Sequence, residues 1–439
     1  MRRIDWTALD ADGRKAALAR PARRSDPALG DRVRDILADV QARGGAAVTE
    51  WSEKLDGAPP RRLAITPEAE AAARAALPPS ATRALRIAAE NVRVFHEATR
   101  PDDSPWVETT PGVRSRLVWR PIASAGLYVP GGTAPLFSSL LMLAIPAAVA
   151  GVGRRVAVTP PPRSGEIHPA MIVTAAEAGL DALWLIGGAQ AIAALTFGAE
   201  LDDGAIEPVD KLFGPGNAWV AEAKKQAAAQ SRFGAGGPAV DMPAGPSELM
   251  VIAGRESDPE LVAADLLSQA EHDADAQVLL VADSERRIEA VVAEIDRQLS
   301  SLPRADIARA ALAEARLVRV RDLDEACEVA NAYGPEHLSL QVPEPEALLP
   351  RLSAAGAVFL GRYAAETLGD YAAGPSHVLP TDGAARTLGG VATASFMTSM
   401  SVQSVSEAGA RALAPVAATL ARLEGLEAHA RSADLRSGT

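Results

Sequence analysis

Apolar and polar positions follow two different periods along the chain, and together they predict an α/β protein. Residues 31–55 and 68–99 place apolar side chains at helical spacing, and the Pro78–Pro79 pair separates two helices within the second stretch. From about residue 120 onward, short apolar runs typical of buried strands alternate with helical patterns. Because strands that alternate with helices usually pair in parallel, this part of the chain is predicted to form doubly wound sheets.

The alternation of strands and helices occurs in two cycles, which predicts two α/β units. The first cycle begins with the run 120–132 and has further predicted strands at 154–162 and 182–188, with helices at 138–153, 170–180 and 189–198. The second has predicted strands at 246–254, 277–283 and 315–322, with helices at 260–272 and 284–302. A helical pattern over 414–436 closes the chain.

We therefore predict two doubly wound Rossmann-like domains that lack a standard GxGxxG motif, with small helical pieces at the two ends. A chain of 439 residues is longer than a single core supports, which also favours two domains. The predicted boundaries are an N-terminal extension over 1–25, a first α/β domain formed by 26–127 and 247–391, a second α/β domain over 128–246, and a C-terminal tail domain over 392–439.

Composition narrows the class of protein. Apolar residues make up 48% of the chain, but no unbroken apolar run is long enough to span a bilayer, so we expect a soluble protein with no membrane partner. The first residues lack the apolar segment of a secretory signal, which makes the cytoplasm the expected location. The net charge of −12 opposes binding to nucleic acid, and the cluster of Arg20, Arg23 and Arg24 is short and diluted by acids. A single cysteine, Cys327, excludes an intramolecular disulfide and a purely thiolate zinc site.

Any metal must therefore have nitrogen and oxygen ligands, and four residues are candidates. Gln269 and His272 lie one helical turn apart, so both side chains can face one ion if the helix persists. Asp370 lies in what we interpret as a glycine-flanked turn, and His429 lies on the tail helix. An amide oxygen, a carboxylate and two imidazoles suit zinc, or manganese or cobalt in its place. Each residue also has a structural interpretation, as a helix-end contact for His272 and as a cap for Asp370.

Glu336 and His337 stand side by side after a Gly-Pro break, where a helix is predicted to give way to a strand. An imidazole titrates near pH ~6.5, so His337 is a candidate for accepting a hydroxyl proton, and the carboxylate is a candidate for activating water. The alternative is a pair that stabilises the turn. His377 follows another Gly-Pro pair and is interpreted as an auxiliary residue that hydrogen-bonds loop backbone.

Two glycine-rich turns are candidate cofactor cradles, LIGGAQAIAAL at 185–195 and DKLFGPGNAWV at 210–220. Gly187 and Gly188 lie at the start of a predicted helix, whose amides would face a pyrophosphate, although glycines serve simple strand-to-helix turns equally well. Gly151 and Gly153 follow a helix and precede a strand, so we interpret them as a helix terminator.

Taken together, these motifs resemble one family. LYVPGGTAPLFSS, GGAQAIAAL, DKLFGPGNAWV, DMPAGPSE, SQAEHD, GPEHL, GDYAAGPSHVLPT and EGLEAH occur in the order seen in histidinol dehydrogenases. The resemblance covers nearly the whole chain, and a long ordered series of motifs is far more specific than any one of them.

The resemblance implies two successive NAD-dependent oxidations, which take L-histidinol through an aldehyde to L-histidine in the last steps of histidine biosynthesis. Matching motif to motif implies one zinc ion per subunit, a catalytic pair in the first α/β domain and NAD in the second. The implied zinc ligands are Gln269, His272, Asp370 and His429, the proton-transfer pair is Glu336 and His337, and the NAD contacts are Tyr128, Gln190 and Asn217. Ser247 and Glu424 are implied as substrate contacts beside His337 and the metal ligands.

In the same way the resemblance implies an intertwined homodimer, in which His429 and Glu424 are supplied in trans. The nearest alternative is a related zinc dehydrogenase of the same fold that acts on another polar alcohol such as a sulfopropanediol. Glu424 argues against a sulfonate, because an acid there suits a cationic amine. A zinc hydrolase is a further alternative, since the same ligands and Glu336 could activate water without a nucleotide. Cys327 lies in a predicted helix, so oxidation of a hydrated aldehyde is preferred to a thiol nucleophile.

Overall fold

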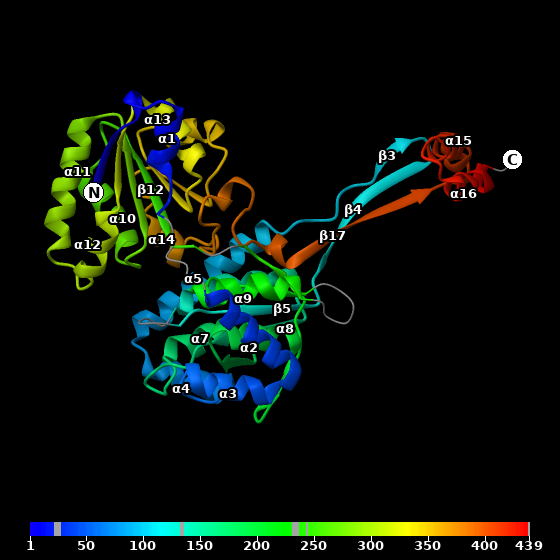
Figure 1. Ribbon diagram of the computed structural model, residues 1–439, viewed down its shortest axis with the longest axis horizontal. Helices are drawn as coiled ribbons and strands as arrows, with labels where there is room; N and C mark the ends of the chain where they lie inside the picture. The colour runs from blue at the N-terminus through cyan, green and yellow to red at the C-terminus, as the bar shows by residue number, and fades with distance from the viewer. Residues whose placement is uncertain (22–27, 132–135, 231–236, 243–244, 438–439) are drawn as a thin grey trace.

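A computed structural model shows two lobes and a long projecting arm (Figure 1). The structure describes residues 1–437 except 22–27, 132–135, 231–236 and 243–244. Arg23, Arg24 and Gly132 therefore lie outside the described residues. Each lobe is built around a six-stranded sheet, which agrees with the prediction of two α/β units.

The first lobe contains a sheet of six parallel strands in the order β1-β14-β13-β12-β15-β16. Its strands are β1 (Arg2–Asp5), β12 (Glu248–Ala253), β13 (Gln277–Ala282), β14 (Arg316–Arg319), β15 (His337–Gln341) and β16 (Ala357–Leu360). The helices that cover its two faces or follow its strands are η1 (Trp6–Ala8), α1 (Ala11–Leu18), α10 (Pro259–Ala270), α11 (Glu285–Leu299), α12 (Ala305–Ala313), α13 (Leu323–Tyr333), η2 (Pro345–Arg351) and α14 (Glu366–Tyr371).

Strand β12 illustrates why this sheet is covered on both sides. Leu249 and Val251 pack with α10, α11 and α12, whereas Met250 and Ile252 pack with α1 and α13 on the opposite face. All four side chains are fully buried, as expected for a parallel strand between two helix layers. The continuous apolar run in the sequence is thus explained by burial on both faces.

The N-terminal residues belong to this lobe rather than forming an extension. β1 pairs in parallel with β14 as an edge strand, and Ile4, Trp6 and Leu18 pack in the core beneath α13. The prediction of a separate piece over 1–25 therefore differs from the structure. A four-residue strand has too short a pattern to be recognised without its pairing partner.

The second lobe contains a sheet in the order β11-β10-β5-β6-β7-β2, with β2 antiparallel to β7. Its strands are β2 (Arg61–Ala64), β5 (Ser124–Tyr128), β6 (Arg154–Thr159), β7 (Ala182–Leu185), β10 (Lys211–Phe213) and β11 (Ala239–Val240). A small hairpin joins β8 (Ala199–Leu201) and β9 (Gly204–Ile206). The helices are α2 (Leu29–Arg43), α3 (Gly45–Leu55), α4 (Pro67–Ala76), α5 (Pro79–Ala98), α6 (Phe137–Ala150), α7 (Pro169–Glu177), α8 (Gly188–Phe197) and α9 (Ala218–Ala229).

The helices of residues 29–98 pack on this second sheet, which corrects the predicted grouping of 26–127 with 247–391. α5 shares a core with α6 and α7, and α2 and α3 share a core with α8 and α9 on the opposite face. The helical periodicity of α2 and α5 showed an apolar stripe on each helix. It could not show which sheet covers that stripe, because any apolar face of suitable width fits the same pattern.

The arm is a three-stranded antiparallel sheet that carries two helices at its end (Figure 1). It consists of β3 (Val107–Thr110), β4 (Val113–Pro121), β17 (Met397–Val405), α15 (Glu407–Leu423) and α16 (Glu427–Ser437), and the 3-10 turns η3 (Ala384–Arg386) and η4 (Thr393–Phe396) precede β17. The sequence predicted the tail helices but neither β4 nor β17. Most of β17 is exposed, so it lacks the alternation of apolar and polar residues by which a half-buried strand is recognised. In the described part of the chain, no helix is both long and apolar enough to cross a membrane.

Candidate active site

His337 lies at the centre of a cluster of buried carboxylates at the amino edge of the first sheet. It is the first residue of β15, and its Nδ1 is 3.6 Å from both Glu336 Oε2 and Glu366 Oε1. On the other side of the ring, Nε2 is 3.5 Å from Asp370 Oδ1. Within the described residues, His337, Glu366 and Asp370 bring ligand-type atoms within 4.8 Å of one another. The cluster combines the groups needed for proton transfer with groups that could hold a cation.

The backbone of Glu248 orients both members of the predicted catalytic pair. Its N–H donates to Glu336 Oε2 at 2.8 Å, and its carbonyl oxygen lies 3.1 Å from His337 Nδ1. Because a carbonyl can only accept, Nδ1 carries the hydrogen and Nε2 is the ring nitrogen that can take a proton. These contacts arise from the β12–β15 pairing, in which Leu249 lies opposite His337.

Burial and charge shift the pKa values in this cluster strongly. Burial by itself would lower the pKa of His337, but the carboxylates of Glu336, Asp370 and Glu366 outweigh it and raise that pKa. Burial raises the pKa of both Glu336 and Glu366. For Asp370 burial acts in the same direction, but the hydrogen bond and charge of His337 are stronger and lower its pKa. Such opposed shifts in one small cluster are typical of sites that move protons.

Gln269 provides the observation that tests a metal at this site. It is fully buried at the end of α10, and neither its Oε1 nor its Nε2 has a hydrogen-bond partner among the described residues. An unpartnered buried amide costs about 1–3 kcal/mol per group. His272 follows the helix, and its N–H donates to the Gln269 carbonyl, so the turn continues as the spacing predicted. His272 is more exposed and is electrostatically coupled to Asp370. By ligand type, an amide oxygen, an imidazole and a carboxylate suit zinc. Among the described residues, the ligand atoms that lie within 4.8 Å of one another include Asp370 but not His272.

The structure corrects the expected setting of Asp370. It lies in the last turn of α14 rather than in a glycine-flanked turn. Glu366 is one turn earlier on the same helix, so both carboxylates face His337. The four-residue spacing of two acids was a signal that could have identified Glu366 from the sequence.

His377 connects this cluster to the second lobe. Its Nδ1 lies 2.7 Å from the carbonyl oxygen of Asp370, so Nδ1 donates and Nε2 is left to accept from Ser139 Oγ at 3.2 Å. Ser139 lies near the start of α6, which follows β5 of the second sheet. The predicted backbone hydrogen bond of His377 is therefore present, and it places the amino edge of the first sheet beside the carboxyl edge of the second.

Tyr128, Gln190 and Asn217 lie at that carboxyl edge: Tyr128 is the last residue of β5, and Gln190 and Asn217 follow β7 and β10. The strand order reverses between β5 and β10, and such switch points are where open α/β sheets bind ligands. Gln190 is fully buried, and its Oε1 has no hydrogen-bond partner in the part of the chain that the structure describes. The side-chain oxygen of Asn217 caps α9 by accepting from the N–H groups of Trp219 and Val220, so only its amide nitrogen is left outside the cap.

The first two amides at the start of α8 have side-chain partners in this structure, which favours the simple strand-to-helix turn over the pyrophosphate cradle. Gly187 N–H donates to Asp56 Oδ2 at 2.9 Å, and Gly188 N–H donates to the Tyr128 hydroxyl at 3.3 Å. Asp56 also accepts from Gln190 Nε2 at 3.0 Å, and burial raises the pKa of its carboxyl. Asp56 was missed because nothing in the sequence relates it to a glycine turn 131 residues away.

The remaining predicted residues occupy different places. Ser247 immediately precedes β12 beside the cluster, and its carbonyl accepts from Gln277. Glu424 and His429 are exposed at the end of the arm, and the structure does not bring them to the cluster of the same chain. Cys327 is buried within α13, as predicted. Asp265 was missed; it is a buried acid that accepts from Gln341 and whose pKa is raised by burial to about 6.

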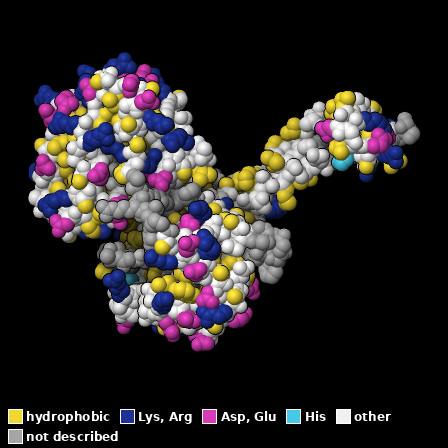
Figure 2. Space-filling model, in the orientation of Figure 1, with side chains coloured by type: hydrophobic (Ala, Val, Ile, Leu, Met, Phe, Trp, Pro, Cys, Tyr) yellow, Lys and Arg dark blue, Asp and Glu magenta, His cyan; other side chains and the backbone are white. Residues whose placement is uncertain are grey.

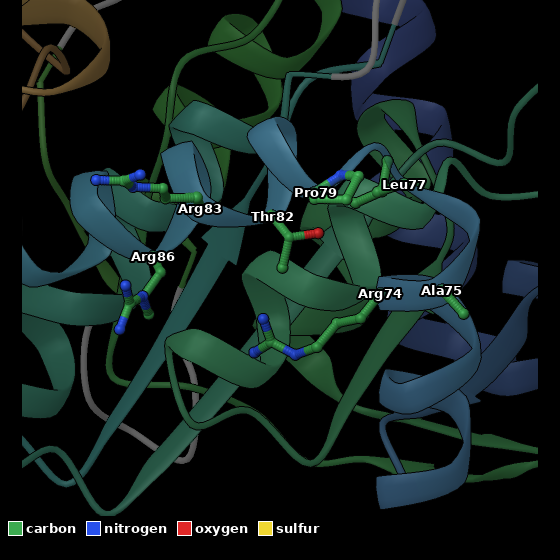
Figure 3. Close-up of a pocket in the computed structure, with 7 residues that line it drawn as sticks. All are labelled: Arg74, Ala75, Leu77, Pro79, Thr82, Arg83 and Arg86. Atoms are coloured by element: carbon green, nitrogen blue, oxygen red, sulfur yellow. The ribbon is translucent and has the colours of Figure 1, made fainter.

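A cavity of about 550 Å³ opens on the outer surface of the second lobe, between α4 and α5 (Figure 3). Its lining consists of Arg74, Ala75, Leu77, Pro79, Thr82, Arg83 and Arg86. None of the predicted site residues contributes to this cavity, and Arg74 is already paired with Glu70 and Glu177. This hollow is therefore separate from the His337 cluster.

One parallel sheet, one largely parallel sheet and the buried acid–base cluster between their edges define an α/β enzyme. The family model described as histidinol dehydrogenase matches residues 19–437. Histidinol dehydrogenase of Xanthomonas campestris pv. campestris (strain 8004) is 48% identical over 438 residues, covering 100% of this chain and 99% of the relative. The Salmonella typhimurium (strain LT2) enzyme is 45% identical, covering 99% and 97%.

A solved structure agrees with the sequence comparisons. The crystal structure of histidinol dehydrogenase from Elizabethkingia anophelis superposes with a TM-score of 0.92 at 37% identity, covering 99% of this chain and 98% of that one. The chain therefore belongs to the histidinol dehydrogenase family, and the fold and family predicted from its motifs are confirmed.

Proposed function

We propose that this protein oxidises L-histidinol through L-histidinal to L-histidine, with zinc and NAD, in the last steps of histidine biosynthesis. Family membership supports the activity. The observations that carry the mechanism are the buried His337–Glu336 pair and the unpartnered buried amide of Gln269 on α10, a helix that contacts α14. A hydrolase would need no nucleotide site, whereas Gln190 presents a second unpartnered buried oxygen at a strand-order switch point.

Gln269, His272 and Asp370 are the residues of this chain that would hold the zinc ion. When bound, zinc would fix the amine and imidazole of the substrate, and NAD would accept the hydride at each oxidation. Asp370 would be held in place as a zinc ligand, because its backbone carbonyl accepts a hydrogen bond from His377.

His337 is proposed as the general base for the alcohol. Its Nδ1–H is held by the Glu248 carbonyl, so Nε2 is aimed away from β12 to receive the hydroxyl proton. The surrounding carboxylates favour the imidazolium that results, because they raise the pKa of His337.

Glu336 is proposed as the base that helps water add to the aldehyde. Its Oε2 accepts from Glu248 N–H, which fixes the carboxylate, and burial raises its pKa toward the range of a general base. Tyr128, Gln190 and Asn217 would bind NAD at the carboxyl edge of the second sheet. Ser247 would contact the substrate at the amino edge of the first sheet, beside Glu336.

We further propose that the active protein is an intertwined homodimer in which each arm completes the partner's site with His429 and Glu424. Two observations support this. Both residues are exposed at the end of an arm that projects from the lobes, and hydrophobic side chains gather along that arm (Figure 2). On α15 an exposed apolar stripe consists of Leu413, Val416, Leu420 and Leu423. A monomer would leave this stripe in water.

The first test is NADH formation by purified protein given L-histidinol and NAD, with and without a chelator. Two equivalents of NADH per substrate, lost on chelation and restored by zinc, are expected. A single equivalent would mean that the reaction stops at the aldehyde. Absence of NADH from metal-loaded protein would reject the proposed activity, and sulfopropanediol and other polar alcohols would be assayed next.

The second test addresses the supply of residues in trans. His337→Asn and His429→Ala are each expected to be nearly inactive alone. Co-expressed, they form mixed dimers in which one site combines an intact His337 with the partner's intact His429, so about a quarter of wild-type activity is expected. Failure to regain activity in mixed dimers shown to form by mass spectrometry would place His429 in its own chain's site, or in none.

A further inference from the structure

We propose that Arg20 is a positioning residue for the Glu336–His337 pair, so that the N-terminal segment is part of the catalytic apparatus. This inference rests on the proposed roles of Glu336 and His337. Its basis is that the Arg20 guanidinium group binds both Glu248, which orients the pair, and the turn at 333–334 that leads into the pair.

Arg20 contacts Glu248 with two hydrogen bonds in a bidentate arrangement. Its Nε donates to Glu248 Oε1 at 2.5 Å and its Nη2 donates to Oε2 at 2.8 Å. The Glu248 side chain is 0% exposed and that of Arg20 is 17% exposed. A buried carboxylate needs such a partner, because removing the cation leaves an uncompensated charge.

The same guanidinium group also holds the turn that precedes Glu336. Nη2 donates to the carbonyl oxygens of Tyr333 and Gly334, at 3.1 and 3.4 Å. The group stacks on the Tyr333 ring, with its central carbon 3.8 Å from the ring centroid. Gly334 adopts a left-handed conformation with φ of 63°, where α13 ends. Arg20 therefore stabilises the conformation by which the chain leaves α13 and enters β15.

Glu248 connects the guanidinium group to the reacting side chains. Its backbone N–H binds the Glu336 carboxylate and its carbonyl binds His337 Nδ1. Its carboxylate also accepts from the N–H of Asp382, the only non-glycine residue of the described chain with a positive φ, 56°. A rotation or shift of Glu248 would move Glu336 and His337 together. The Ala19 carbonyl, next to Arg20, is itself fixed by Arg316 Nη2 at 2.7 Å.

Arg14 offers a matched control, because it makes the same kinds of contact elsewhere. It lies on α1, pairs with the buried Glu325 at 3.3 Å and stacks on Trp6 at 5.0 Å. Glu325 lies in the first turn of α13, whereas Tyr333 is its last residue. Arg14→Ala thus removes an ion pair and a ring contact from the same segment without touching Glu248 or the turn, and Glu325 keeps Arg321 as a partner.

The experiment compares Arg20→Ala, Arg20→Lys, Arg14→Ala and His337→Asn in the full-length, zinc-loaded protein, with L-histidinol and NAD. Arg20→Ala is expected to lower kcat by about 10²-fold, the effect of a displacement near 1 Å at a catalytic group, while the KM for NAD changes less than about twofold. Arg20→Lys keeps the charge but loses the fork, so an intermediate loss is expected. Added guanidinium ion should restore part of the activity of Arg20→Ala and none to Arg14→Ala.

If Arg20→Ala does not fold, the double variant Arg20→Ala/Glu248→Gln takes its place in the series, because it also removes the buried charge of Glu248. A folded Arg20 variant with kcat near that of wild type would overturn the proposal. The proposal would also be overturned if Arg14→Ala lost as much kcat as Arg20→Ala and if both losses followed the fraction of folded protein. An active His337→Asn would instead reject the roles proposed for the catalytic pair, and with them the basis for this inference.

Discussion

His96 in the second lobe and His337 in the first are both almost completely buried, but the pKa values of their imidazoles are shifted in opposite directions. His96, on α5 of the second lobe, is 0% exposed, and burial lowers its pKa to about 4. His337, in the first lobe, is 4% exposed, yet its pKa is raised. His96 has Thr393 Oγ1 3.3 Å from its Nδ1, whereas carboxylates surround His337.

The comparison shows that burial alone makes an imidazole a neutral structural group. A buried histidine becomes a site for holding a proton only when charged neighbours compensate for the loss of water. The two candidate sites differ in the same way. The amino edge of the first sheet collects carboxylates around His337, while the carboxyl edge of the second presents glycine turns, Gln190 and the carboxylates of Asp56 and Asp241, the latter paired with Lys224. This difference supports the proposal that acid–base chemistry occurs at the first edge and dinucleotide binding at the second.

The largest expected effect is on turnover in His337→Asn. The asparagine amide can still donate to the Glu248 carbonyl, so the variant removes Nε2 while keeping the internal hydrogen bond. A loss in kcat of about 10³-fold is expected, within the ~10²–10⁴-fold range of general acid–base catalysis. Steady-state NADH formation measures it, and elemental analysis is expected to show zinc still bound. Turnover above a tenth of wild type would remove His337 from the role of base.

The next effect is on metal retention in Gln269→Leu. The substitution should weaken zinc binding but should stabilise the metal-free protein. Zinc affinity is expected to fall by about 10–100-fold or more, the range seen for residues that support a metal site. The metal-free variant should be more stable than the metal-free wild type by roughly 1–3 kcal/mol, because an unpartnered buried amide has been removed. Urea unfolding with and without chelator measures both. A variant less stable than wild type in chelator would mean that Gln269 has a structural partner instead.

A smaller effect is expected at the second edge. Gln190→Ala should raise the KM for NAD by about 2–10-fold, the value of one neutral hydrogen bond, with little change in kcat at saturating NAD. Gln226→Ala is the matched control, since Gln226 lies on α9 of the same lobe and donates to Gly30. Equal KM values in the two variants would exclude Gln190 from the NAD site.

The smallest effect concerns the pH dependence of stability, and it tests whether the buried His96 is neutral in the folded protein. Because His96 takes up a proton near pH 4 when folded but near ~6.5 when unfolded, the unfolded state binds more protons between these values. The lowered pKa of His96 therefore adds at most about 3 kcal/mol to the free energy of unfolding. This contribution is complete above about pH 6.5 and is lost as the pH falls toward 4. His96→Gln should therefore flatten the rise of unfolding free energy with pH over this window. His168→Gln, at an exposed position, is the control. An unchanged slope in His96→Gln would show that His96 is protonated in the folded protein.

Long periodic patterns and ordered motifs were enough to predict much of this molecule. The helices α6, α10 and α11 and the strands β12 and β13 occur where periodicity predicted them, because each reports its own burial along a single segment. Gly151 ends α6 in a left-handed conformation with φ of 90°, as the helix-terminator interpretation predicted. The edge strand β1 and the arm strands β4 and β17 were missed because their patterns depend on partners far away in the chain.

The sequence by itself determined the α/β class, the family and the residue types available for chemistry, because these depend on local periodicity and on ordered motifs. Only the tertiary structure decided that residues 29–98 cover the second sheet, that Glu366 joins His337, and that Glu248 and Arg20 frame the pair. The physical reason is that these relations are set by strand register and by packing between separate segments. Glu366 is 29 residues from His337, Glu336 is 88 residues from Glu248, and Glu248 is 228 residues from Arg20, and no local pattern carries information about such pairs.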